Sequence, residues 1–194
     1  MLHFWDDLEK RLEALKDCSE KKDAKEYEKI CHKLFSRYKK HPLHLAKIST
    51  FLMNTNQPGL SMMFLDELIK LDPKTFYNYS LKADALLKLG ENAKAFRYYD
   101  LAIGMESHNE LTLLAKADAL YTIGLDEESI LICEKVLKDN PTHPYALSRK
   151  ATSLTKLGKD DEAFVIAKKV LKIEPNNSIA KKLESIISSR TLDN

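Results

Sequence analysis

Residues 89–96 read LGENAKAF, residues 123–130 read IGLDEESI, and residues 157–164 read LGKDDEAF. The three stretches begin at residues 89, 123 and 157, so the interval between them is constant. Each stretch has glycine in second place and alanine or serine in seventh. A fixed period of this length is typical of repeat proteins, in which each repeat is one small unit of helices or strands. The sequence therefore predicts an array of units of equal length.

Other positions keep the same period. They are Pro73, Pro141 and Pro175; Ala83, Ala117 and Ala151; Leu86, Leu120 and Leu154; and Leu89, Ile123 and Leu157. The resulting frame gives four units, 42–75, 76–109, 110–143 and 144–177. Ser107 takes the proline position of the second unit, and Asn56 takes the glycine position of the first. Because asparagine tolerates the left-handed conformation better than most residues, we expect the turn to survive at Asn56.

Each unit is predicted to form two antiparallel helices, which makes the chain all-α. Within residues 76–89, the apolar positions follow the spacing of one helix face. The glycines are expected to end the first helices as left-handed C-caps; they are Gly90, Gly124 and Gly158. The residues two positions later are expected to act as N-caps of the second helices; they are Asn92, Asp126 and Asp160.

The segments on either side of the four units also have helical patterns. Residues 1–41 are predicted to form a degenerate hairpin, whose second helix Asp23 caps. Residues 178–190 are predicted to form a C-terminal capping helix, with Ser178 as its N-cap, that seals the last repeat. We therefore expect a single domain over 1–194 with about eleven helices and no strands.

The turn and the following alanine in 89–96 and 157–164, together with the terminal prolines, closely resemble the tetratricopeptide repeat (TPR) family. The chain departs from the family where it has Leu45, Tyr79, Leu113 and Leu147 in place of a common early tryptophan. The resemblance implies a solenoid of helix hairpins that forms a right-handed superhelix. Its first helices would line a concave groove that binds a protein segment.

Composition and charge exclude several classes of protein. The formal net charge is only +2, which argues against a dedicated nucleic-acid binder. The first residues lack the pattern of a signal peptide, and no stretch is apolar enough to span a membrane. The three cysteines form no C-x-x-C pair, which favours a reduced, cytoplasmic setting.

The sequence contains no motif for catalysis, and we expect neither enzyme activity nor a cofactor. His41 and His44 are spaced to share a metal ion, but no third ligand is evident, so a turn between repeats is the favoured interpretation. Cys31 and His32 are adjacent, and adjacent side chains on a helix diverge, so we do not expect them to act as a catalytic nucleophile and its base. The basic residues at 33–41 favour a solvated helix end, with an acidic partner and nucleic acid as weaker alternatives.

The predicted site is the concave groove, at the positions that resemble the ligand-binding positions of the family. They are Lys47, Thr50 and Asn54; Tyr77, Ser80, Asp84 and Lys88; Leu111, Leu114, Asp118 and Tyr121; and Tyr145, Ser148, Arg149 and Thr152. Aromatic, hydroxyl and charged side chains of both signs suit a peptide or helix with a few apolar anchors. For Asp84 and Asp118, two interpretations remain open: they hold a cationic residue of the ligand, or they are solvated acids.

Some members of this family capture chaperone tails through a carboxylate clamp of Lys, Arg and Asn. The corresponding positions hold Ala46, Thr50, Leu81, Leu111 and Ala115, or, shifted by one unit, Ser80, Asp84, Ala115, Tyr145 and Arg149. Only Arg149 fits, and the carboxylates of Asp84 and Asp118 would repel a terminal carboxylate. We therefore predict that the groove does not bind chaperone tails in this way.

The leading functional hypothesis is a non-enzymatic adaptor or scaffold for an unidentified protein or peptide. The alternative is a structural protein that self-associates through its terminal helices, with Phe4 and Trp5 at one end and Ile186 and Ile187 at the other. The two hypotheses differ in whether these apolar residues are buried within one chain.

Overall fold

The computed structural model describes residues 2–105 and 110–192, and the side chains of 7–105 and 110–189. These described residues form eleven α-helices and no strand, so the all-α class and the number of helices are confirmed. Ser107 and the boundary between the second and third units lie outside the described residues. No helix among the described residues has the length and apolar character that crossing a membrane requires.

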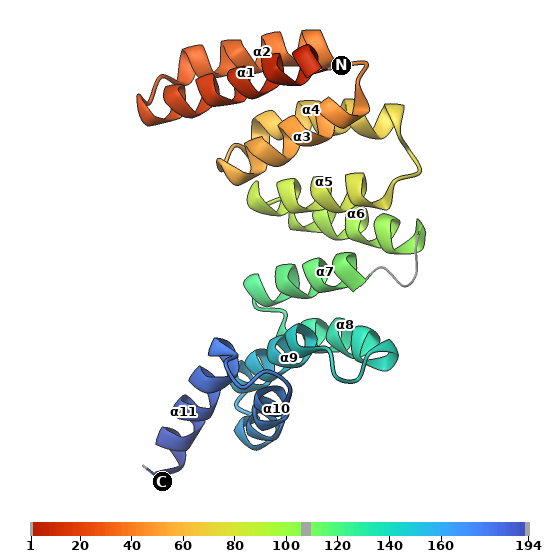
Figure 1. The fold of residues 1–194 in the computed structure, drawn as a ribbon. Helices are drawn as coiled ribbons and strands as arrows, with labels where there is room; N and C mark the ends of the chain where they lie inside the picture. The colour runs from red at the N-terminus through yellow and green to blue at the C-terminus, as the bar shows by residue number, and fades with distance from the viewer. Residues whose placement is uncertain (1, 106–109, 193–194) are drawn as a thin grey trace. The chain divides into compact units, whose positions relative to one another are not determined.

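The chain divides into two compact units, Met1–Ser107 and His108–Asn194 (Figure 1). Unit 1 holds α1 (Leu2–Glu20), α2 (Ala24–Tyr38), α3 (Pro42–Asn54), α4 (Pro58–Leu71), α5 (Phe76–Lys88) and α6 (Asn92–Met105). Unit 2 holds α7 (Glu110–Thr122), α8 (Asp126–Asp139), α9 (Pro144–Lys156), α10 (Asp160–Ile173) and α11 (Ser178–Leu192). The single domain and the right-handed superhelix concern both units together and stay predictions.

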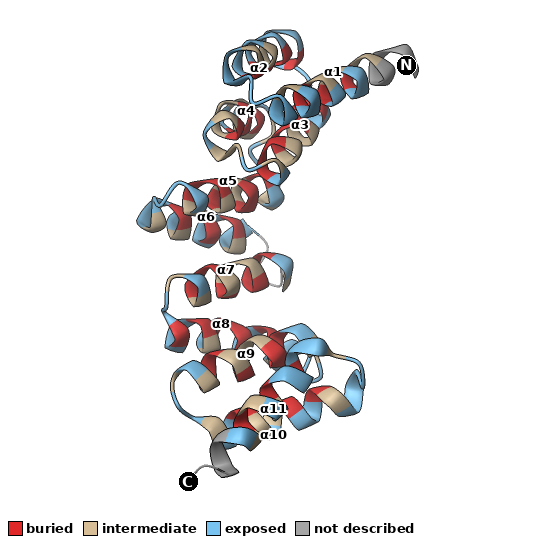
Figure 2. Ribbon diagram, turned by 90° about the vertical axis from the view of Figure 1, so that its left-hand side faces the viewer, coloured by how far each residue is buried: buried red, intermediate tan, exposed pale blue. Residues whose placement is uncertain are grey.

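Each unit is a stack of helical hairpins in which the first helices are neighbours. In unit 1, α1 packs against α3 and α3 against α5, and in unit 2, α7 packs against α9 and α9 against α11. Buried residues run along the faces that the helices turn toward one another (Figure 2). The first helices of each unit therefore share one face, on which the predicted groove residues lie.

The turns inside the hairpins confirm the role of the glycines. Gly90, Gly124 and Gly158 have φ of 79°, 82° and 74°, and Asn56 adopts the same left-handed region with φ of 56°. The residue after each one donates its N–H to the carbonyl five residues back. These bonds are Gln57 to Leu52 at 2.8 Å, and Glu91 to Leu86, Leu125 to Leu120 and Lys159 to Leu154 at 2.9 Å. This pattern is the Schellman ending of a helix, which requires a left-handed residue at the turn.

The predicted N-caps of the second helices are wrong by one residue. Asn92, Asp126 and Asp160 are the first helical residues, and the caps before α8 and α10 are Leu125 and Lys159, with no side-chain cap bond. The reason is that the Schellman turn leaves only one residue before the next helix. The carbonyl of Leu125, for example, already accepts the first helical hydrogen bond, from the Ser129 N–H at 3.0 Å.

At the two outer helices, one predicted cap is confirmed and one is wrong. Asp23 caps α2 by accepting from the Glu26 N–H at 3.1 Å. Ser178 is the first residue of α11 rather than its cap, because the Asn177 side chain accepts from the Ala180 N–H at 3.0 Å. The C-terminal helix therefore begins with an asparagine cap.

The core of each unit combines leucines with small residues that let helices approach closely. In unit 1 the largest fully buried side chains include Tyr38, Phe64 and Tyr99. In unit 2, Ile187 of α11 is buried with Leu154 and Ala163. Ile187 is therefore used inside the chain and is not free to pair with a second chain, while the Phe4 and Trp5 side chains lie outside the described residues.

Candidate functional site

Five of the seven predicted groove residues of the first two repeats line one hollow in unit 1. It has a volume of about 330 Å³ and lies between α3 and α5. Its lining is Thr50, Met53, Asn54, Tyr77, Leu81, Asp84, Leu87 and Lys88. Five of these eight residues were predicted from sequence, and they come from two separate segments of the chain. The hollow therefore lies between two neighbouring first helices, and its role as a binding groove stays a prediction.

A second hollow continues the same face between α3 and α1. It has a volume of about 370 Å³, and it shares Thr50 and Asn54 with the first hollow. Its other lining residues are Glu9, Leu12, Glu13, Lys16, Lys47 and Phe51. The contributions of α1 were missed, although α1 is the first helix of a hairpin and therefore occupies the same place as α3 and α5.

Internal contacts already fix several polar groups of these hollows. Lys88 Nζ donates to the Met53 carbonyl at 3.1 Å, which ties α5 to α3. Asp84 accepts a hydrogen bond from the Tyr99 hydroxyl, and Lys47 forms an ion pair with Glu9. The exposed Asn54 amide, in contrast, makes no hydrogen bond within the described part of the chain. It therefore offers a ligand both a donor and an acceptor.

The corresponding face of unit 2 is occupied by a cluster of charged and aromatic side chains from α7 and α9. Arg149 Nε donates to Asp118 Oδ1 at 2.7 Å, and the Tyr145 hydroxyl donates to Asp118 Oδ2. The Arg149 guanidinium lies 4.2 Å from the centre of the Tyr121 ring, within the range of a cation–π contact. Lys156 Nζ lies 3.5 Å from the same ring centre and donates to the Tyr121 carbonyl.

This cluster gives Asp118 a partner within the chain, which neither interpretation of Asp118 included. The Arg149 of the same chain neutralises its carboxylate, so Asp118 does not await a cation from a ligand. Burial raises the pKa of Tyr145, and its hydrogen bond to Asp118 acts in the same direction. Burial works against the charge of Arg149, but the contacts with Tyr145 and Asp118 outweigh it and raise the Arg149 pKa. The cluster is thus a stable ionic link between two neighbouring first helices.

The outward placement of three predicted residues is wrong. Ser80, Leu114 and Ser148 are only 7%, 8% and 2% exposed. The three residues occupy the same position in three successive repeats, so one wrong assignment of that position explains all three. The groove face of the first helix is narrower than predicted, and this position turns toward the core.

A neighbouring position of the repeat is apolar and exposed throughout. Tyr77, Leu111 and Tyr145 were predicted as groove residues, and they are 46%, 72% and 40% exposed. The same position holds Leu43 and Ile179, at 65% and 39%, which were missed. The repeat period would have found both, because 43 and 179 extend the series 77, 111, 145 by one step at each end. We call these five residues the apolar column.

Two of the residues considered for metal binding or nucleophilic catalysis, His44 and Cys31, are buried in the core. The His44 ring stacks on Tyr38, with ring centres 4.8 Å apart, and is largely buried. Burial raises the pKa of the Cys31 and Cys133 thiols to about 12, which keeps them protonated and unreactive. Among the described residues, no group of three or more His, Cys, Asp or Glu is placed to hold a metal ion.

Comparison with known proteins agrees with this architecture. Residues 77–109 match the family model of the tetratricopeptide repeat, and no curated protein sequence matches the chain. The crystal structure of MamA is 18% identical, with a TM-score of 0.64, and the alignment covers 87% of this chain and 92% of MamA. Residues 77–109 therefore resemble one tetratricopeptide repeat, and the chain shares the fold of MamA.

Two similar structures carry a reference to peptides. YrrB, described as a TPR protein with an unusual peptide-binding site, is 11% identical with a TM-score of 0.65, over 90% of each chain. The first TPR domain of Spaghetti (RPAP3), bound to the HSP90 peptide SRMEEVD, is 22% identical with a TM-score of 0.56. That alignment covers 62% of this chain and 96% of the domain. At these identities the likeness establishes the fold alone.

Proposed function

We propose that the protein is a non-enzymatic adaptor that binds a peptide segment of another protein on the face formed by its first helices. The observation that carries the proposal is the pair of adjoining hollows in unit 1, between α1, α3 and α5. They combine apolar walls, the available amide of Asn54 and fixed charges within one concave surface. Such a surface binds a ligand by contact and shape. The described residues that line it form no arrangement of side chains typical of catalysis.

The chemistry of this face favours an extended segment with apolar side chains at intervals. Tyr77 and Leu43 of the apolar column are exposed on adjacent first helices, and an exposed tyrosine is a common anchor in interfaces. Asn54 lines the same hollow as Tyr77 and offers its amide to a peptide backbone. The proposed ligand therefore places an apolar residue on Tyr77 and a backbone peptide group near Asn54.

The proposal excludes tails that end in a free carboxylate held by a clamp. Asp84 lies in the hollow between α3 and α5, and no arginine lines either hollow of unit 1. A terminal carboxylate would meet the like charge of Asp84. The lysines of the two hollows, Lys16, Lys47 and Lys88, already contact Glu13, Glu9 and the Met53 carbonyl. The binding of an HSP90 peptide by the RPAP3 domain is a property of that domain.

The test is a selection of peptides from a random display library on the whole protein, followed by titration of the selected peptide. We expect Tyr77→Ala and Asn54→Ala to weaken its binding by about tenfold each, which corresponds to about 1.4 kcal/mol. The matched control is Leu101→Ala, which removes an apolar side chain that is 51% exposed on the second helix α6. Equal affinity of all four proteins would refute the groove as the binding site.

A further inference from the structure

The second helix of the first hairpin carries a regular row of positive charges. Lys21, Lys25, Lys29, Lys33 and Arg37 follow one another at intervals of four residues, and the last four lie in α2. Four residues advance an α-helix by about 6 Å, so Lys25 to Arg37 span about 18 Å along one side of α2. We call these four residues the α2 cation row. The four-residue spacing is visible in the sequence and extends the basic segment at 33–41 toward the start of α2.

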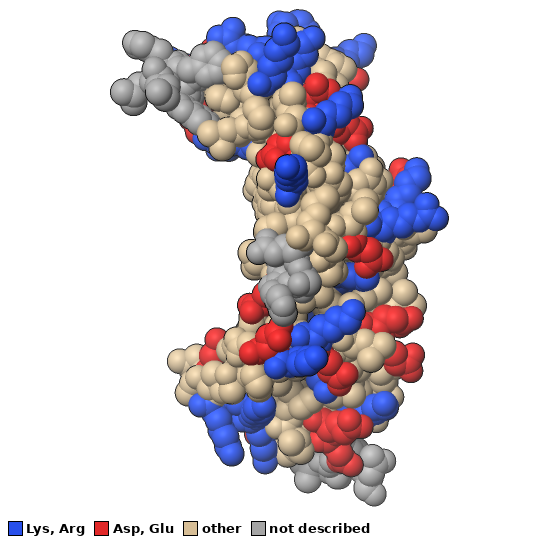
Figure 3. All heavy atoms as spheres, turned by 90° about the vertical axis from the view of Figure 1, so that its right-hand side faces the viewer, with Lys and Arg blue, Asp and Glu red and all other residues tan. Residues whose placement is uncertain are grey.

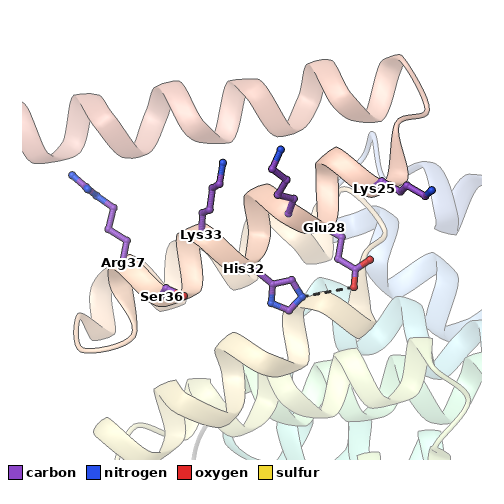
Figure 4. Close-up of a pocket in the computed structure, with 7 residues that line it drawn as sticks. Lys25, Glu28, His32, Lys33, Ser36 and Arg37 are labelled. Atoms are coloured by element: carbon purple, nitrogen blue, oxygen red, sulfur yellow. Dashed lines mark ion pairs between the residues drawn. The ribbon is translucent and has the colours of Figure 1, made fainter.

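The α2 cation row borders a shallow hollow on the outer side of the helix. The opposite side of α2 is buried through Tyr27, Cys31, Leu34 and Tyr38. The hollow has a volume of about 820 Å³, and its lining is Lys25, Glu28, Lys29, His32, Lys33, Ser36 and Arg37. Figure 4 shows Lys33 and Arg37 on the side toward α1, and Glu28 and His32 on the other side. All seven lining residues belong to α2, so the hollow is an open surface along one helix, which we call the trough.

Half of the row is not neutralised by neighbouring acids. Lys29 pairs with Glu26 at 2.9 Å, and Arg37 pairs with Asp7 of α1 at 3.0 Å. Lys25 and Lys33 are exposed and form no ion pair with any residue that the structure describes. The pair of Lys29 is itself exposed, and exposed pairs of this kind are weak enough for a partner to replace them.

The charge of the protein is concentrated in this segment. Residues 21–41 contain eight Lys or Arg and three Asp or Glu, although the formal net charge of the whole chain is only +2. In the space-filling view, Lys and Arg atoms gather over the N-terminal hairpin (Figure 3). Because the trough lies on a second helix, it is a different surface from the proposed groove on the first helices.

The lining of the trough distinguishes between the possible anionic partners. It contains no Phe, Tyr or Trp on which nucleic-acid bases would stack. It also contains no Leu, Ile, Phe or Trp that would enter a membrane. The one carboxylate of the lining, Glu28, lies 3.7 Å from His32 on the other side of the helix (Figure 4). The evenly spaced cations of the row instead suit carboxylates that repeat along a peptide.

We propose that the α2 cation row binds an acidic segment of a partner protein whose carboxylates repeat about every 6 Å, as they do on a helix with Glu at every fourth position. The basic segment of the sequence then has a second role beside the groove, and the protein engages its partners on two surfaces. Lys25 and Lys33 supply the unpaired charges, and Lys29 exchanges Glu26 for the partner.

The test uses a fluorescent peptide that repeats Glu-Ala-Ala-Ala four times, and an isomer with its four glutamates in one block. The variant is Lys25→Gln/Lys29→Gln/Lys33→Gln of the whole protein. The control is Lys135→Gln/Lys138→Gln/Lys182→Gln, which removes the same charge from exposed sites of unit 2. Fluorescence anisotropy is measured at about 50 mM salt, where screening is weak, and circular dichroism shows that both variants stay folded.

We expect the repeating peptide to bind the wild type and the control equally, and the α2 variant about tenfold more weakly. We also expect the block isomer to bind the wild type more weakly than the repeating peptide. Equal losses in both variants would show attraction to net charge alone and overturn the proposal. It would also be overturned if anionic vesicles or single-stranded oligouridine bound the row while the repeating peptide did not. Tyr77→Ala should leave this binding unchanged, which separates the result from that of the groove.

Discussion

At the scale of single residues, the turns are the positions with the strictest requirement. The backbone of Gly90, Gly124 and Gly158 lies in the left-handed region, where a Cβ atom is strained even though open space surrounds each glycine. Asn56 shows that asparagine satisfies the same requirement. The turns were predictable because this requirement is local and does not depend on distant contacts.

A substitution at Gly90 measures this strain directly. We expect Gly90→Ala to lower the free energy of unfolding by about 1 kcal/mol, because the left-handed conformation is unfavourable for alanine. The control is Gly104→Ala in α6 of the same unit, where no positive φ is needed and no atom lies within 4 Å of the added Cβ. There we expect stabilisation by about 0.5 kcal/mol, from helix propensity. Urea unfolding followed by circular dichroism tests both, and a stabilising Gly90→Ala would contradict this explanation of the turn.

At the scale of elements, a repeated ion pair joins α4 to α5 and α8 to α9. Lys82 of α5 contacts Asp66 of α4 at 2.5 Å and the Tyr98 hydroxyl of α6 at 2.8 Å, and its side chain is only 12% exposed. Lys150 of α9 and Glu134 of α8 repeat the contact at 2.7 Å, two repeats further along the chain. The contact therefore belongs to the repeat and fastens neighbouring hairpins.

The Lys82 contact predicts a dependence of stability on pH. Burial lowers the Lys82 pKa, but the hydrogen bonds to Asp66 and Tyr98 outweigh this and raise it above its ordinary value. A raised pKa means that the folded state holds the proton more tightly. The stabilisation is therefore full below pH ~10.4, the pKa of an unfolded lysine, and it is lost as the pH rises through the folded pKa.

We expect Lys82→Met to lower the free energy of unfolding by about 1 kcal/mol at neutral pH, and the difference from wild type to shrink above pH ~10.5. The control is Lys70→Met, whose pair with Glu67 is exposed and whose loss should have almost no effect. Chemical unfolding across the pH range measures both. A difference that stays constant through pH ~11 would show that the charge of Lys82 is not what stabilises the fold.

Three features of the helices and their contacts could not be predicted correctly from the sequence. Helix spacing predicted the hairpins. The resemblance to the TPR family placed Ser80, Leu114 and Ser148 in the groove, but they are buried, because a small difference in the rotation of a helix moves a whole position of the repeat from surface to core. The caps of α8 and α10 were misplaced by one residue for lack of the turn geometry. The link between Asp118 and Arg149 was missed because the two residues lie on different helices, and sequence alone does not show which charges meet.

At the scale of the whole molecule, the two proposed surfaces predict different ligands. The face of the first helices in unit 1 is apolar with few free charges, whereas the outer face of α2 is cationic. Binding at the α2 cation row should weaken steeply with salt, and binding at the groove should change little. An adaptor with these two surfaces can hold two segments at once.

The groove should reject the chaperone peptide that the RPAP3 domain binds. We expect SRMEEVD to show no saturable binding to the groove in a calorimetric titration at about 150 mM salt, because Asp84 repels its carboxylates and the α2 cation row is screened. The control is the same peptide with an amidated C-terminus, which should behave identically. Tight binding that depends on the free carboxylate would refute the exclusion of a clamp.

An NMR titration of the labelled protein with the selected peptide locates the binding surface. We expect the perturbed amides to fall in α3 and α5, around Thr50 to Asn54 and Tyr77 to Lys88, because these segments line the hollow between the two helices. Perturbations confined to the second helices α4 and α6 would contradict this expectation, because the peptide would then bind outside the groove.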